Sequence, residues 1–296
     1  MPFLENDLLK IEIKSKGAEL CSIRSIKNNT EFVWEANPNV WGSHAPNLFP
    51  IIGAMKDDSY FYNGKKYNMP KHGFARHNKD FEVISNSNSE VTFQLKSNDE
   101  LRAIYPFEFE FLITYELKDN ELLIHHTVKN TDSKTMYFSV GGHPAFVCPL
   151  FKDESYTDYF LEFEKQETSK SYLLNMATGL VSDKTKPVFD SPNTINLHGD
   201  LFNEDALIFK DLTSRQVALK HKQKGEILNV KFEGFPFLGI WAKPNAPYVC
   251  IEPWIGIADS ESTNQQIKDK EGIVTLEPKK SFKATYSIML NRNLLN

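Results

Sequence analysis

Several features that define common protein classes are missing from this chain of 296 residues. It has only three cysteines, Cys21, Cys148 and Cys250, and none has a CxxC spacing or another spacing typical of a metal site. No apolar run approaches the roughly 18 residues that cross a membrane. The N-terminal segment lacks the basic stretch and apolar core of a secretory signal. We therefore expect a reduced, cytoplasmic protein without a membrane span.

Positive charge is also scarce. The chain carries 34 Lys and Arg against 39 Asp and Glu, a formal net charge of −5, with no long basic run. This balance argues against nucleic acid or an anionic membrane as a partner. There is no glycine-rich phosphate loop, and the Lys-Asp-Asp run at 56–58 has no accompanying metal ligands. We accordingly expect neither a cofactor nor a metal.

What the chain has in quantity is alternating hydrophobic and polar residues, the pattern of half-buried strands. Hydrophobic residues make up 41% of the chain, enough for a large core. The alternation predicts strands at 9–13, 91–95, 107–117, 228–232 and 282–290. A further apolar segment at 121–130 follows the turn-prone Lys-Asp-Asn, so it is expected to form a hairpin with the strand before it.

Helical signals are few. One short helix is expected after Ser97, stopped by Pro106, and another in the segment from Ser262 to Gly272. No linker, repeat or alternation of strands with helices interrupts the chain. We therefore predict an all-β protein, residues 1–296 forming a single domain of mainly antiparallel strands in two large packed sheets.

Three segments depart from the alternation. In the first, "KHGFARH", Lys71, His72 and Arg76 offer hydrogen-bond donors to an oxygen-rich ligand, and Phe74 offers an apolar ring. The alternative is a solvated basic turn, because loops are commonly polar and charged. The segment is too short and isolated for a nucleic-acid surface.

The second segment is "FSVGGHPAFVCP", which sets His143 between a glycine pair and a proline. Glycine permits backbone conformations that other residues rarely adopt, and Pro144 restricts His143 toward extended geometry. Histidine titrates near neutral pH and so suits acid–base catalysis, although buried structural histidines are common. Cys148, in the apolar run that follows, has the setting of a structural cysteine.

The third segment is "PYVCIEPWIGIADSES", where Glu252 stands in an apolar strand ended by Pro253. Burial there is expected to raise the pKa of this carboxyl group. Buried glutamates are rare unless paired or functional, which favours a functional interpretation. Asp259, in "IADSE", fits ordinary turn chemistry, and so does Asp205, just before the apolar run at 206–209.

Taken together, His143 and Glu252 are a candidate acid and base for proton transfer at a polyhydroxylated substrate. At these residues the chain resembles the aldose 1-epimerase (galactose mutarotase-like) superfamily, most closely its LacX-like bacterial branch. The resemblance covers nearly the whole chain, from "KSKGAELCSI" through "LFPIIG", "HGFAR", "GGHPAF", "DALIFKDL" and "CIEPW" to "KEGIVTLEPKKSF". The motifs occur in that order.

The resemblance implies a β-sandwich of the supersandwich type with a sugar-binding cleft across one sheet. It implies an isomerase that interconverts the α and β anomers of an aldose without cofactor or metal, as a monomer or homodimer. By motif position, Glu252 would be the general base and His143 the general acid. His72, Arg76 and Asp205 match positions that bind sugar hydroxyls; Trp254 or Phe74 is a candidate for stacking on the sugar.

The chain departs from this pattern before "LFP", where many relatives carry an arginine and this sequence has Ser43 and His44. Lys71 stands where a glutamine is common, and with Arg76 it can still supply positive charge. We therefore favour a neutral hexose as substrate, with a hexose 6-phosphate as the alternative. A carbohydrate-binding or regulatory protein without activity also remains open. A glycoside hydrolase would need two placed carboxylates, of which only Glu252 is a good candidate.

Overall fold

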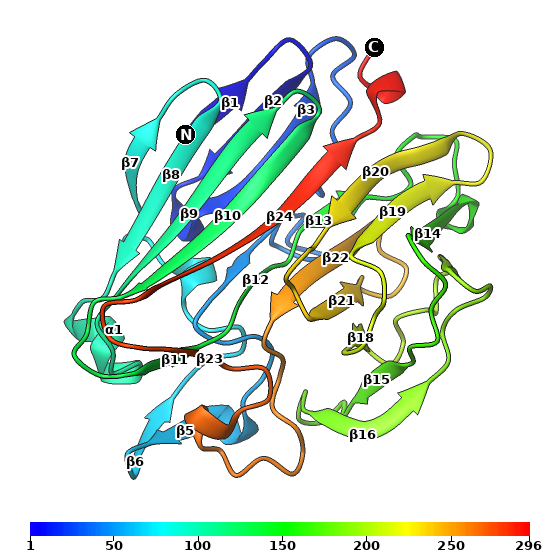
Figure 1. Cartoon of the computed structure of the whole chain (residues 1–296). Helices are drawn as coiled ribbons and strands as arrows, with labels where there is room; N and C mark the ends of the chain where they lie inside the picture. The colour runs from blue at the N-terminus through cyan, green and yellow to red at the C-terminus, as the bar shows by residue number, and fades with distance from the viewer.

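Two large antiparallel sheets form the body of the protein, as a computed structural model of residues 1–296 shows (Figure 1). The first sheet has nine strands, in the order β17 (Thr194–Asn196), β14 (Tyr159–Phe163), β19 (Gln216–His221), β20 (Gly225–Lys231), β24 (Ser281–Leu290), β10 (Glu121–Asn130), β9 (Phe109–Lys118), β8 (Glu90–Lys96) and β7 (Glu82–Asn86). The second has eight: β16 (Val181–Lys186), β15 (Ser171–Leu174), β18 (Leu207–Phe209), β21 (Phe237–Trp241), β22 (Tyr248–Ile255), β12 (Val140–Gly142) and β4 (Asn47–Leu48), with β13 (Ala145–Val147) also paired to β22. The all-β prediction is confirmed.

Smaller elements surround these sheets. A three-stranded sheet comprises β1 (Phe3–Glu5), β2 (Leu9–Lys14) and β3 (Glu19–Ser25), and two-stranded sheets pair β5 (Ser59–Tyr62) with β6 (Lys65–Asn68) and β11 (Met136–Phe138) with β23 (Val274–Leu276). The one α-helix is α1 (Asp99–Ile104), and short 3₁₀ turns span Lys16–Ala18, Lys56–Asp58, Ala75–His77, Tyr156–Asp158, Ile267–Asp269 and Arg292–Leu294. None of these helices has the length and apolar character needed to cross a membrane.

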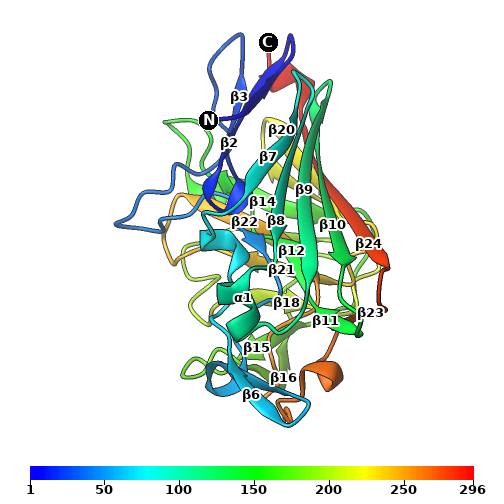
Figure 2. The same cartoon turned by 90° about the vertical axis from the view of Figure 1, so that its left-hand side faces the viewer.

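The strands predicted from alternation form where expected. β9 and β10 each bury every second residue, and they pair from Glu121↔Lys118 to Asn130↔Phe109, which confirms the predicted hairpin. Figure 2 shows the long strands β8, β9, β10 and β24 side by side, with α1 near the ends of β8 and β9.

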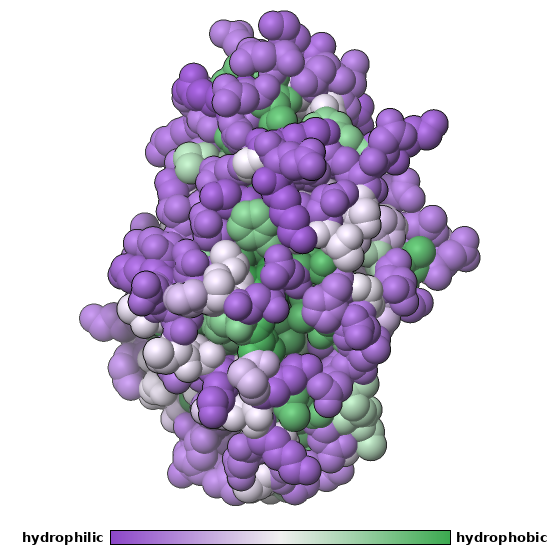
Figure 3. All heavy atoms as spheres, turned by 90° about the vertical axis from the view of Figure 1, so that its right-hand side faces the viewer, coloured by the Kyte–Doolittle hydropathy of each residue, from purple (hydrophilic) through white to green (hydrophobic).

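Hydrophilic side chains cover most of the face in Figure 3, with apolar ones gathered near its middle.

One cluster of 71 buried hydrophobic residues forms the core and includes residues of both large sheets and of the three-stranded sheet. Phe49, which follows β4, stacks on Phe111 of β9 with ring centroids 4.5 Å apart. A buried polar contact also crosses the interior, because His126 of β10 lies 3.1 Å from Asn47 of β4. Face-to-face packing of this kind fixes the position of the eight-stranded sheet, which carries the candidate site.

The two helix predictions have different outcomes. α1 begins after Asn98, whose side chain accepts a hydrogen bond from the backbone of Leu101, and it ends before Pro106 as expected. The helix predicted within 262–272 is wrong, because only the turn Ile267–Asp269 forms. Gln265 has a φ of 58°, which a right-handed helix does not accommodate, and its side-chain amide donates to the backbone carbonyl of Lys56.

Candidate active site

A cavity of about 200 Å³ lies on the eight-stranded sheet, lined by residues of β15, β18, β21 and β22 and by the loops beside them. Seven of the eight residues selected from the sequence line it, although they come from four separate stretches of chain: Lys71, His72, Arg76, His143, Asp205, Glu252 and Trp254. Sites for drug-sized ligands occupy roughly 300–1,000 Å³, so this cavity suits a smaller polar molecule.

The backbone places His143 directly across from Glu252. Gly141 pairs with Trp254, and Ala145 pairs with Cys250 on the same strand, β22. Between these pairs, the N–H of Ile251 donates to the carbonyl of Pro144 at 3.2 Å. The register is therefore continuous, and opposed residues of antiparallel strands have Cβ atoms about 4.5–5.5 Å apart. A ladder of hydrogen bonds, rather than a flexible loop, holds the pair together.

The glycines before His143 are required for space rather than for unusual backbone angles. Neither Gly141 nor Gly142 is among the residues with positive φ, contrary to the sequence-based expectation. A Cβ atom on Gly142 would lie 2.4 Å from the hydroxyl of Tyr286, on β24 of the facing sheet. A Cβ atom on Gly141 would lie 2.6 Å from the carbonyl oxygen of Pro253. Any side chain here would push the segment that carries His143 out of position.

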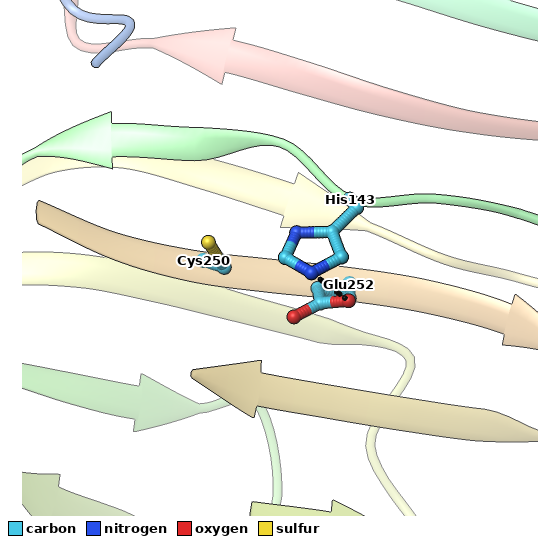
Figure 4. A group of neighbouring side chains, drawn as sticks. All are labelled: His143, Cys250 and Glu252. Carbon is cyan, nitrogen blue, oxygen red and sulfur yellow. Dashed lines mark ion pairs between the residues drawn. The ribbon is translucent and has the colours of Figure 1, made fainter. Parts of the chain in front are cut away.

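His143 and Glu252 point toward one another, as Figure 4 shows, and both line the cavity. His143 Nε2 lies 3.1 Å from Glu252 Oε2, with side-chain exposures of 10% and 1%. The contact has the length of an ion pair without the alignment of a hydrogen bond, so Glu252 Oε2 has no hydrogen-bond donor. His143 Nδ1, Arg76 Nε and Trp254 Nε1 are also buried without a partner. Four residues of the cavity lining thus each hold a buried polar atom without a hydrogen-bond partner, which calls for an explanation.

Burial moves the two pKa values in opposite directions. It raises the pKa of Glu252 well above its ordinary value, with the charge of Asp205 acting in the same sense and that of Lys71 opposing it. It lowers the pKa of His143 to about 3, helped by the charges of Arg76 and Lys71. Both shifts follow from the cost of keeping a charge away from water. Without a ligand, the pair is thus favoured as neutral imidazole and neutral carboxylic acid.

The segment that carries His72 and Arg76 is fixed by close backbone contact. Gly73 has a φ of 71°, and a Cβ atom there would lie 2.2 Å from the carbonyl oxygen of Phe49. His72 Nδ1 accepts a hydrogen bond from the N–H of Gly53 at 3.1 Å, which leaves Nε2 to carry the ring proton. Burial lowers the pKa of His72 well below its ordinary value, and the nearby His143 adds to the effect.

Asp205 reaches the cavity from the turn before β18, and Trp254 reaches it from β22, with β21 between the two strands. Asp205 precedes β18 with a φ of 69°, and its carboxylate accepts a hydrogen bond from the N–H of Ala206, in agreement with the expected turn role. Trp254 follows Glu252 by two residues on β22, so both side chains lie on the same face. A Cβ atom on Gly239 of β21 would lie 2.4 Å from the indole of Trp254, so this glycine makes room for the ring.

Phe74 lies away from the cavity, which corrects the expectation that its ring faces a sugar. It is 8% exposed, and its ring packs edge-on against Phe49 at 5.9 Å and stacks on Phe109 at 6.0 Å. In "HGFAR" the side chain of Phe74 is thus directed into the aromatic interior, while Arg76 reaches the cavity.

Sequence reasoning missed two aromatic residues of the site, Trp41 and Trp241. Trp41 stacks on His143 with centroids 5.0 Å apart and an interplanar angle of 27°, while Trp241 meets the same imidazole edge-on at 5.9 Å. Trp41 belongs to a loop and Trp241 ends a strand, so neither is marked by alternation. The one feature of the sequence that could have pointed to them is that tryptophan is rare. The chain has four tryptophans, and three of them line this cavity.

One group of side chains in the structure has the composition of a metal site. Donor atoms of His143, Cys250 and Glu252 all lie within 4.8 Å of one another, and the three residues are buried. Cys250 lies two residues before Glu252 on β22 and is a free thiol. No metal-site spacing is visible in the sequence because His143 is far from Cys250 and Glu252 along the chain.

Comparison with known proteins agrees with the resemblance seen in the sequence. A family model described as aldose 1-epimerase matches residues 3–288. The curated protein LacX, encoded on a plasmid of Lactococcus lactis subsp. lactis, is 33% identical over 97% of this chain and 98% of its own length.

Solved structures with the same fold include two from lactobacilli. A galactose mutarotase related enzyme from Lactobacillus acidophilus has a TM-score of 0.91 and 39% identity, covering 98% of this chain and 96% of its own. A galactose mutarotase-like protein from Lactobacillus casei has a TM-score of 0.91 and 32% identity, covering 98% of this chain and all of its own.

Proposed function

The chain belongs to the aldose 1-epimerase family, and on that premise we propose that it interconverts the α and β anomers of an aldohexose. The observation that carries the proposal is the buried pair His143–Glu252, 3.1 Å apart in the wall of a cavity of about 200 Å³. Two proton-transfer groups at this spacing can act on two neighbouring oxygens of one small substrate.

The reaction needs one proton removed and one proton supplied. Glu252 removes the proton from the hydroxyl on the anomeric carbon, and His143 donates a proton to the ring oxygen. The bond between the anomeric carbon and the ring oxygen breaks, which gives the open-chain aldehyde. Rotation about the C1–C2 bond presents the other face of the carbonyl, and the ring closes with the two proton transfers reversed.

The pKa shifts match this exchange. Ring opening converts imidazolium and carboxylate into imidazole and carboxylic acid, and burial favours the second, uncharged state. A lowered pKa makes the imidazolium of His143 a stronger acid toward a weakly basic ring oxygen. A raised pKa makes the carboxylate of Glu252 a stronger base. The charged state can be reached by proton transfer within the pair, without exchange with solvent.

The remaining side chains of the cavity suit a sugar. Lys71, His72, Arg76 and Asp205 supply donors and an acceptor for hydroxyl groups. Trp254 offers an aromatic face to the C–H surface of the ring, and Trp41 packs over the imidazole of the proposed acid.

A hexose 6-phosphate is the second candidate substrate, because two cationic residues, Lys71 and Arg76, line the cavity. The positions before "LFP", where many relatives carry an arginine, add no positive charge to the cavity. Ser43 and His44 are not in the cavity wall, and His44 Nδ1 lies 2.7 Å from the backbone carbonyl of Trp34. We therefore retain the neutral hexose as the primary proposal.

We also propose a cytoplasmic location and a monomer or homodimer as the working form. The three cysteines are unpaired, which is the state that a reducing compartment maintains.

NMR saturation transfer between the α and β anomeric protons tests the activity directly. Purified protein should accelerate exchange for glucose or galactose above the rate in buffer alone, and His143→Asn should abolish the increase while sugar binding persists. A parallel panel of hexose 6-phosphates decides between the two substrate classes. Binding of sugars without accelerated exchange of any aldose or aldose phosphate would instead identify a carbohydrate-binding protein.

A further inference from the structure

Cys250 is a buried nucleophilic group beside the proposed catalytic pair for which the reaction has no use. Its side chain and that of Glu252 lie on the same face of β22, since they are two residues apart. His143 faces Glu252 from the neighbouring backbone, and the thiol of Cys250 lies beside this pair, as Figure 4 shows. Their donor atoms all lie within 4.8 Å of one another.

We propose that His143, Cys250 and Glu252 form a binding site for a thiophilic divalent cation, best matched by Zn²⁺, and that the bound ion inhibits the protein. Thiolate sulfur, imidazole nitrogen and carboxylate oxygen are the donors that zinc takes from proteins. Mg²⁺ and Ca²⁺ require more oxygen ligands than this cluster offers. The set of three protein ligands leaves a fourth coordination position for a small molecule.

The geometry is close to what zinc requires. Bonds of about 2.0–2.3 Å in a tetrahedral site separate the donor atoms by roughly 3.3–3.8 Å. The present maximum of 4.8 Å would have to shorten by about 1 Å. One nitrogen–oxygen distance in the cluster, from His143 Nε2 to Glu252 Oε2, is already 3.1 Å.

The carboxyl group gives an independent indication of a ligand here. Glu252 is 1% exposed, and its Oε2 atom has no hydrogen-bond donor. A bound cation would supply the missing partner for this buried oxygen. Zn²⁺ also matches the combined charge of one thiolate and one carboxylate, so the occupied cluster is neutral. Cys250 and the protonated Glu252 each release one proton to solvent when their bonds to zinc form.

The surroundings also set a limit on affinity. Lys71 and Arg76 line the same cavity, and their charges oppose the entry of a cation. We therefore expect weaker binding than at a structural zinc site. The ion would engage the lone pairs of both groups that the proposed reaction uses for proton transfer, which is why it inhibits. The loss of activity rests on the proposed function; the binding itself does not.

Two measurements on the whole 296-residue chain test the metal binding and the inhibition separately. Titration with Co²⁺ alone should produce the intense near-ultraviolet absorption of a thiolate-to-cobalt bond in the wild type. Titration with Zn²⁺ alone should suppress anomeric exchange, and EDTA should restore it. Cys250→Ser removes the soft donor, and Cys148→Ser removes another buried thiol outside the cluster, as a matched control.

In Cys250→Ser we expect no thiolate–cobalt absorption. Half-inhibition of this variant should require a Zn²⁺ concentration at least about tenfold higher than for the wild type. Each exchange rate is normalised to that of the same protein without metal. Cys148→Ser should behave as the wild type. Should Cys250→Ser fold poorly, judged by circular dichroism, Cys250→Ala provides the same comparison.

Equal zinc sensitivity of the wild type and Cys250→Ser would overturn the proposal, and so would loss of the cobalt band in Cys148→Ser only. If the wild type catalyses no anomeric exchange, the proposed function fails, and the cobalt absorption still decides the metal site.

Discussion

Replacing Glu252 with glutamine should lower activity and raise stability in the same protein. A general base contributes about 10²–10⁴-fold to rate, so loss of the carboxylate removes about 3–5 kcal/mol of transition-state stabilisation. Glutamine has nearly the same shape, so the cavity and the binding of sugar should persist. We therefore expect anomeric exchange to fall at least about a hundredfold.

The stability change follows from the raised pKa of Glu252. The folded chain keeps a proton that the unfolded chain releases above the ordinary value of 4.5. Wild-type stability accordingly falls as pH rises from 4.5 toward the folded pKa, by up to about 1.4 kcal/mol per pH unit. Glutamine does not titrate, so Glu252→Gln avoids this loss. Its advantage over the wild type should be larger at pH 7 than at pH 5.

Urea unfolding followed by circular dichroism at the two pH values measures this difference, and saturation transfer measures the activity. Glu167→Gln is the matched control, because Glu167 is 7% exposed, lies outside the cavity and accepts hydrogen bonds from the backbone N–H groups of Thr213 and Ser214. Removing that satisfied carboxylate should lower stability and leave exchange intact. A Glu252→Gln protein whose stability relative to the wild type does not change with pH would refute the reasoning.

Two further predictions concern titration and a buried ion pair. Because burial lowers the pKa of His143 to about 3 and raises that of Glu252, kcat/KM should change little between pH 5 and pH 7. Activity should fall only when His143 gains a proton in acid or Glu252 loses one in base. A titration limb centred near pH 6.5 in the pH–rate profile would contradict this prediction. Asp259→Asn should destabilise the protein by about 3–5 kcal/mol, since Lys270 Nζ lies 2.7 Å from Asp259 Oδ1 with both side chains 2% exposed. Urea unfolding of this variant and of the double variant Asp259→Asn/Lys270→Met, which should recover much of the loss, checks the second prediction.

The long strands were predictable because one face of each is buried and the other is not. β9 and β10 follow period two along their whole length, and the sequence carries that period directly. β22 is buried at every position, so its residues show no alternation. Glu252 stood out for the opposite reason, as a carboxylate in an otherwise apolar run.

The errors arose where tertiary contacts decide the outcome. Phe74 and Arg76 lie two residues apart in the same short segment, so the sequence does not distinguish which side chain faces the cavity. The ring of Phe74 is directed inward because it packs against Phe49. Asp259 looked like turn chemistry because its partner, Lys270, reaches it through folding. Trp41 stacks on a residue about a hundred positions away, a contact that no local pattern encodes.

The register that sets His143 opposite Glu252 also determines which changes of chain length the protein can tolerate. One residue inserted between Gly141 and Ala145 would shift the ladder and turn side chains to the other face of the sheet. The segments that carry Asp205 and Trp41 lie in a turn and a loop, where insertions are better tolerated. Recognition can thus diversify through loops while the chemistry stays fixed on paired strands. Grafting those loops between relatives should change sugar preference without rebuilding the proton-transfer pair.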